Sequence, residues 1–161
     1  MTPGKNATFD VAGALNRATG EIIYGLGPRK THALCRDLLT QLDRTYPAPR
    51  VTRIYVVVDT YCMHKAKAVE QWLASHPRVA MLWLPTYGPQ AHPMERVFGD
   101  GHDQCTRNHK RKRLGDVVHD VERHLRQNSP WLYKLSRLYD APEVTAAVER
   151  LTVEQQAKRA A

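Results

Sequence analysis

The chain has 161 residues, and 24 Lys and Arg against 16 Asp and Glu give it a formal net charge of +8 and a pI of about 9.6. A chain of this length buries a substantial core, and a basic excess of this size favours a polyanionic partner. No apolar run reaches the roughly eighteen residues of a membrane span, and the N-terminus has no apolar signal-peptide core. The three cysteines are widely spaced, which indicates a reducing cytoplasm and argues against a disulfide framework.

The first part of the chain predicts a strand hairpin followed by a helix. Residues 8–15 and 21–26 carry loosely alternating apolar side chains on either side of a turn at residues 16–20, which is typical of a hairpin with a longer loop. Thr31 has the side chain of a helix N-cap, and leucines along one stripe extend the predicted helix to about residue 46.

The strand that comes next is the centre of the pattern. Residues 53–58 are mostly β-branched or aromatic, and such a near-continuous apolar run predicts a strand buried on both faces. The run ends at Asp59, and acids at the C-terminal ends of strands lie where open α/β sheets bind their ligands. A helix over residues 65–75 and a strand over residues 79–84 are expected to follow.

A second acid, Glu95, follows a segment rich in proline. Pro93 is predicted to be the first residue of a helix, because its missing N–H costs nothing there, and Glu95 then lies in the first turn. Asp59 and Glu95 make a candidate pair of metal-binding carboxylates. Their spacing alone favours a simpler interpretation, in which Asp59 caps the next helix and Glu95 complements a helix dipole.

The residues around the two acids favour the metal-binding interpretation over the helix-capping one. Val56-Val57-Val58-Asp59-Thr60 is followed by His64-Lys65, then by Leu84-Pro85-Thr86-Tyr87-Gly88-Pro89 and His92-Pro93-Met94-Glu95-Arg96-Val97-Phe98. This series closely resembles the DDE-type transposases of the mariner superfamily, and in particular their bacterial insertion-sequence branch. The resemblance covers roughly residues 2–126.

The resemblance implies a fold, a chemistry and a set of site residues. The implied fold is an α/β, ribonuclease-H-like mixed sheet flanked by helices. Asp59 and Glu95 are the implied catalytic residues and ligands of two Mg²⁺ or Mn²⁺ ions, which serve the cutting and joining of DNA at transposon ends. His64 matches a family histidine and His92 replaces a family Asn, so both are candidates for supporting the site.

One part of the family pattern has no counterpart. The family's first catalytic Asp lies on a strand upstream of the segment that matches residues 2–6. We therefore expect a partial catalytic core over residues 1–127 that lacks the usual first strand, and a helical C-terminal tail over residues 128–161. The strand before Asp59 would then pair directly with the hairpin or accept an edge from another chain. Such a transposase fragment is expected to be inactive alone, with its two-ion site incomplete.

A dense basic run follows the Glu95 helix. It consists of Arg107, Lys110, Arg111, Lys112 and Arg113. A charge run is usually a solvated surface, but its place after the Glu95 helix favours contact with DNA phosphates. An apolar stripe predicts a helix over residues 113–127.

Three interpretations stay open at this point. The chain is a catalytic fragment, or a non-catalytic DNA-binding or interaction protein that modulates an intact transposase or self-associates. An unrelated Mg²⁺ nuclease of the same fold is the third interpretation, and the full family motif makes it the least favoured. The bacterial cytosol, near the nucleoid, is the expected compartment. Cys62, His64, His92, Cys105 and His109 fit no zinc-ligand spacing. The recognised terminal repeat, the target site and the oligomeric state do not follow from the residues.

Overall fold

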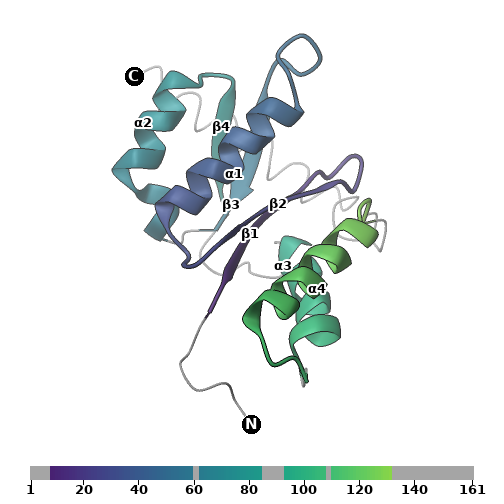
Figure 1. The fold of residues 1–161 in the computed structure, drawn as a ribbon. Coiled ribbons are helices and arrows are strands. Elements are labelled where there is room, and N and C mark those ends of the chain that lie inside the picture. The colour runs from purple at the N-terminus through teal and green to yellow at the C-terminus, as the bar shows by residue number, and fades with distance from the viewer. Residues whose placement is uncertain (1–7, 60–61, 85–92, 108–109, 132–161) are drawn as a thin grey trace.

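A β-hairpin divides the molecule into two groups of elements (Figure 1). The computed structural model describes residues 8–59, 62–84, 93–107 and 110–131. Helices α1 and α2 and strands β3 and β4 lie on one side of the hairpin, and helices α3 and α4 lie on the other (Figure 1). We call these groups the β3–β4 unit and the α3–α4 unit. The predicted tail helices beyond residue 131 lie outside the described residues.

The hairpin pairs β1 (Asp10–Leu15) with β2 (Ile22–Gly27) in antiparallel register, as predicted. Its turn contains Gly20 at φ 76°, a conformation that favours glycine, and a Cβ there would lie only 2.7 Å from the carbonyl oxygen of Trp131. Alternate residues of β1 serve the two sides of the molecule: Val11 packs with the α3–α4 unit and Ala12 packs with α1. The hairpin therefore contributes to both cores.

The β3–β4 unit begins with helix α1 (His32–Thr45). The predicted N-cap is confirmed, because the Thr31 hydroxyl accepts a hydrogen bond from the Leu34 amide at 3.4 Å. At the other end of α1, the Arg78 guanidinium donates to the Asp43 carboxylate at 2.7 Å and to the Val51 carbonyl at 2.8 Å. Arg78 thereby ties the end of α1 to the start of strand β4.

Strands β3 (Ile54–Val58) and β4 (Val79–Trp83) pair in parallel register. The connection is a short 3-10 helix, η1 (Cys62–Lys65), followed by α2 (Lys67–Ser75). The predicted helix over residues 65–75 corresponds to α2, which begins two residues later than predicted and ends at the same residue. The core of the unit is formed by buried residues of α1, α2 and both strands, which are Cys35, Leu39, Leu42, Ile54, Val58, Val69, Val79 and Met81.

One expectation about β3 is wrong, and one of the two pairing alternatives is not found in the described residues. The strand is not buried on both faces, because Tyr55 is 44% exposed and Val57 is 40% exposed. It also does not pair with the hairpin: within the described residues β1 pairs with β2 and β3 pairs with β4, in separate two-stranded sheets. The apolar run predicted a strand correctly, but burial of its second face requires a covering element, and the described residues supply none there. The predicted α/β class is confirmed.

The α3–α4 unit contains α3 (Pro93–Gly101), a π-helix, η3 (His102–Thr106), and α4 (Leu114–Gln127). Gly13 of the hairpin makes room for α3, since a Cβ there would lie 2.4 Å from the Met94 methyl carbon. The core of the unit is formed by Ile22, Met94, Val97, Val121 and Leu125. Among the described helices, none is long and apolar enough to cross a membrane.

Candidate functional site

Asp59 follows directly after the last residue of β3, as predicted, and its side chain is half exposed. One of its oxygens, Oδ1, lies 3.3 Å from Nε2 of His64 in η1. The His64 side chain is only 14% exposed, and its other ring nitrogen, Nδ1, lies 3.4 Å from the Cys35 sulfur. Cys35, His64 and Asp59 therefore form a chain of contacts that leads from the core of the β3–β4 unit to the acid.

Cys35 is the buried end of this chain of contacts. Burial raises the pKa of the Cys35 thiol to about 11, so the sulfur stays protonated and uncharged at neutral pH. A neutral thiol can donate its hydrogen to Nδ1, which favours the imidazole tautomer whose Nε2–H donates to Asp59. The contact orients the Asp59 carboxylate at the end of β3.

Glu95 lies in the first turn of α3, with Pro93 as the first helical residue, as the sequence predicts. The Glu95 residue is exposed, while its neighbours Met94 and Val97 are 2% and 0% exposed and anchor the helix on the hairpin. Glu95 therefore belongs to the α3–α4 unit, whereas Asp59 belongs to the β3–β4 unit. The relative position of the two acids depends on the hairpin between the units.

The described part of the chain contains no group of three or more His, Cys, Asp or Glu side chains close enough to hold a metal ion. Two acids near Glu95 are engaged in ion pairs: Asp100 lies 2.8 Å from Nε2 of His124, and Asp103 lies 3.1 Å from Arg107. His92 lies outside the described residues. The structure thus offers Asp59 and Glu95 as accessible carboxylates, with His64 beside Asp59.

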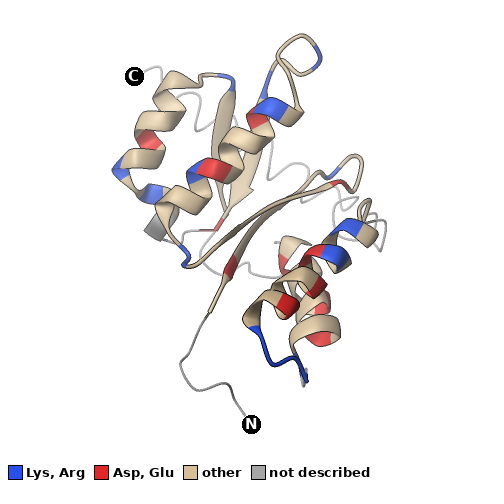
Figure 2. Cartoon of the chain, viewed as in Figure 1, with Lys and Arg blue, Asp and Glu red and all other residues tan. Residues whose placement is uncertain are grey.

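The basic run before α4 is visible in Figure 2 as a stretch of Lys and Arg leading into that helix. Arg107, Lys110 and Arg111 line a cavity of about 630 Å³, whereas Lys112 and Arg113 do not. The remaining lining residues come from η3 and α4, and are Gln104, Cys105, Asp120, Arg123, His124 and Gln127. The sequence analysis missed Arg123, although its position three residues after Asp120 on a predicted helix was a usable signal.

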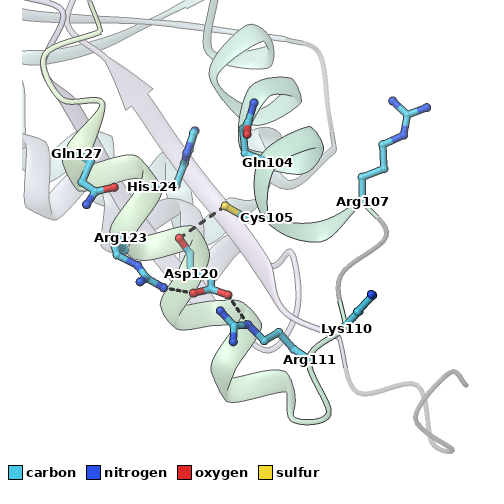
Figure 3. Close-up of a pocket in the computed structure, with 9 residues that line it drawn as sticks. All are labelled: Gln104, Cys105, Arg107, Lys110, Arg111, Asp120, Arg123, His124 and Gln127. Atoms are coloured by element: carbon cyan, nitrogen blue, oxygen red, sulfur yellow. Dashed lines mark hydrogen bonds and ion pairs between the residues drawn. The ribbon is translucent and has the colours of Figure 1, made fainter.

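Asp120 organises this cavity. Its carboxylate lies between Arg111 and Arg123 (Figure 3), accepting a hydrogen bond from Arg111 Nε at 2.7 Å and pairing with Arg123. The hydrogen bond from Arg111 lowers the pKa of Asp120, so the acid stays charged at neutral pH. The Cys105 thiol donates to the Asp120 carbonyl at 3.6 Å, which joins η3 to α4.

Comparison with known proteins decides the family. The profile of a family described as DDE superfamily endonuclease matches residues 1–118. The chain belongs to the DDE superfamily of endonucleases. The matched span includes Asp59, Glu95 and the whole basic run, while most of α4 lies beyond it.

One similar sequence and one similar structure extend the comparison for this DDE superfamily member. It is 33% identical over 131 residues to the insertion element IS630 uncharacterized 39 kDa protein of Shigella sonnei, covering 81% of this chain and 38% of that protein. Its fold is similar to the crystal structure of the Mos1 mariner paired end complex with Mn, with a TM-score of 0.62, 16% identity, and coverage of 84% of this chain and 43% of the other. The predicted resemblance to the insertion-sequence and mariner branch is confirmed, as is the ribonuclease-H-like fold. The chain spans less than half the length of either protein.

Proposed function

We propose that the chain forms part of a transposase catalytic core that acts on DNA at transposon ends, with Asp59 and Glu95 as metal-binding catalytic carboxylates. The observation that carries the proposal is Asp59 itself: an acid at the C-terminal end of a parallel strand, oriented by His64 at 3.3 Å. Membership of the DDE superfamily supports it, and the structural neighbour is a paired end complex with Mn.

The two acids suit the hard divalent cations Mg²⁺ and Mn²⁺, which prefer carboxylate oxygens. When bound, a pair of such ions stabilises the entering and leaving oxygens of a phosphodiester in an in-line displacement. The chain's own contribution is to present Asp59 from the β3–β4 unit and Glu95 from the α3–α4 unit, with His64 holding the Asp59 carboxylate in one orientation.

Cleavage by this chain alone is not expected. The resemblance implies three acids, and the described residues contain no cluster of three candidate metal ligands. Two carboxylates attract a hard cation without completing its coordination shell, so we expect weak metal binding and no cutting of DNA.

Titration calorimetry with Mn²⁺ tests the assignment of the two acids. Asp59→Asn and Glu95→Gln should each abolish the weak binding seen with the unaltered chain. Glu70→Gln is the matched control, because Glu70 is also an exposed glutamate in the first turn of a helix, and it should leave binding unchanged. Equal affinity of the unaltered chain and the Glu95→Gln variant would contradict the assignment.

A cleavage assay on DNA that carries transposon ends tests the expected inactivity. The unaltered chain with Mn²⁺ should give no product. Robust metal-dependent cleavage that Asp59→Ala abolishes would mean that another acid completes the site.

The alternative function is a non-catalytic DNA-binding or interaction protein, with an intact transposase or a second copy of the chain as partner. One observation favours it: the basic cavity is lined by neither Asp59 nor Glu95. DNA binding measured in a chelator distinguishes the two functions when it is combined with the Mn²⁺ titration. Binding of DNA without any binding of Mn²⁺ would favour the alternative.

A further inference from the structure

The cavity between η3 and α4 is a second charged site, and the two carboxylates of the proposed function do not account for it. It is walled by the π-helix, by the segment at Lys110 and Arg111, and by α4 (Figure 3). π-Helical turns are rare and are frequent at functional sites. Here η3 contributes Gln104 and Cys105 to the wall.

The charge of the cavity is strongly positive. Four cationic side chains line it, Arg107, Lys110, Arg111 and Arg123, against the single carboxylate of Asp120. His124 also lines the cavity, but its Nε2 is directed to Asp100 at 2.8 Å. A site with this excess of cations suits an anion and does not suit a metal ion.

The arginine donors of the cavity are held in place by hydrogen bonds, and each keeps further N–H groups for a ligand. Arg111 contacts Asp120 through Nε and Arg123 through one terminal nitrogen, so each guanidinium keeps further N–H groups. Lys110 has no hydrogen bond or ion pair with the described residues. Asp120 thus fixes two arginines side by side, so the site is preorganised for binding an anion.

The geometry points to an anchoring site for the phosphodiester backbone of a DNA strand, in which Lys110, Arg111 and Arg123 contact phosphate oxygens. The inference rests on the proposed function for the identity of the polyanion. Planar guanidinium groups match phosphate oxygens in pairs, and the amides of Gln104 and Gln127 add neutral donors at the same wall. The lining contains no large apolar side chain that would enter a bilayer, which favours a DNA strand over a membrane surface as the ligand.

The inference differs from simple attraction by the basic run. If the run acted only through its summed charge, Lys110 and Lys112 would contribute equally, and so would Arg111 and Arg113. An anchoring cavity instead makes Lys110 important and Lys112 dispensable. It also makes Arg123 important, although Arg123 lies outside the run on α4.

The experiment is DNA binding by fluorescence anisotropy in a chelator, over a series of salt concentrations, with labelled DNA of arbitrary sequence. Lys110→Gln and Arg123→Gln should each weaken binding about fivefold or more and reduce the slope of log K against log salt by about 1. Lys112→Gln and Arg113→Gln are the matched controls, equal in charge removed, and should change the affinity by less than about twofold. Circular dichroism and urea unfolding check that each variant remains folded.

Each outcome decides between distinct conclusions. Equal losses from Lys110→Gln and Lys112→Gln would overturn the anchoring cavity and leave general attraction by the basic run. Inorganic pyrophosphate that competes as well as a DNA strand of equal phosphate concentration would overturn the backbone assignment in favour of a small-anion site. Absence of DNA binding by the unaltered chain would overturn the inference together with its DNA partner, while the Mn²⁺ titration would still test Asp59 and Glu95 separately.

Discussion

The two units on either side of the hairpin hold their chemistry by different means. In the β3–β4 unit, the buried residues are all apolar or Cys35, and Asp59 is positioned by a contact chain that starts in this core. In the α3–α4 unit, the buried apolar cluster is smaller. Ion pairs join α3 to α4, through Asp100 and His124, and α4 to the segment before it, through Asp120 and Arg111. A rigid apolar support suits one oriented carboxylate, whereas a network of charges suits the capture of a flexible polyanion.

Removing one leucine from each core should show which unit supplies more of the stability. Leu39 and Leu125 are both 2% exposed, but Leu39 belongs to the larger cluster. Each substitution by Ala should lower the free energy of unfolding by about 2–5 kcal/mol, since a cavity adds to the lost burial. We expect Leu39→Ala to have the larger effect, because more neighbours lose contacts around it.

Tryptophan fluorescence during urea unfolding measures this comparison locally. Trp72 and Trp83 pack on the core of the β3–β4 unit, and Trp131 packs on that of the α3–α4 unit. A Trp131→Phe background leaves probes in the first unit alone. Coincident transitions with and without Trp131 would show that the units unfold together, and a larger loss from Leu125→Ala would reverse our ranking of the two cores.

Alkaline pH should weaken the β3–β4 unit through Cys35. The thiol loses its proton at about 9.0 in an unfolded chain and at about 11 in its buried position, where burial raises the pKa. A raised pKa in the folded state means that the neutral thiol contributes full stability below pH 9, and that this contribution disappears as the pH rises toward 11. The difference between these two pKa values corresponds to a loss of about 2–3 kcal/mol at most in the free energy of unfolding.

Urea unfolding at a series of alkaline pH values measures this dependence. The unaltered chain should lose stability faster than Cys35→Ala between pH 9 and 11. Cys105→Ala is the matched control in the other unit: burial raises the pKa of that thiol too, but the residue is only partly buried, so the difference should be smaller. Parallel curves for the unaltered chain and Cys35→Ala would contradict the prediction.

Local signals in the sequence were enough for most elements. The Thr31 cap, Pro93 at the start of α3 and the apolar stripe of α4 each depend on residues within a few positions, and the structure has all three. The exposure of Tyr55 was not predictable in this way, because burial depends on which distant elements cover a strand face. The pattern of strand residues is the same whether or not such an element is present.

The candidate site residues also differ in whether local sequence signals or distant elements determine them. Asp59 and Glu95 were predicted as site residues from local motifs, and the motif also included His64. The contact between His64 and Cys35 joins residues 29 positions apart, and no local pattern links them. The cavity is a similar case, since Arg111 meets Asp120 only after the chain has turned into α4. Networks of charge between elements require the three-dimensional arrangement, because charged residues occupy most solvated surfaces.

Acid pH should weaken the α3–α4 unit through Asp120, with the smallest of the effects considered. The hydrogen bond from Arg111 lowers the pKa of Asp120 below its ordinary value of 3.8. A lowered pKa in the folded state means that the ion pair contributes stability above pH 3.8 and that this contribution is lost as the pH falls below that value. The difference in urea midpoint between the unaltered chain and Asp120→Asn should stay constant from pH 7 to about pH 4 and shrink below it.

Asp116→Asn is the matched control, because Asp116 is an exposed aspartate one turn earlier on α4 with no ion pair to a described residue. A larger effect of Asp116→Asn, or an Asp120→Asn effect that persists unchanged to pH 2.5 or so, would mean that the pairing of Asp120 with Arg111 and Arg123 does not stabilise the α3–α4 unit. The cavity would then lack the fixed guanidinium groups on which its capture of phosphate depends.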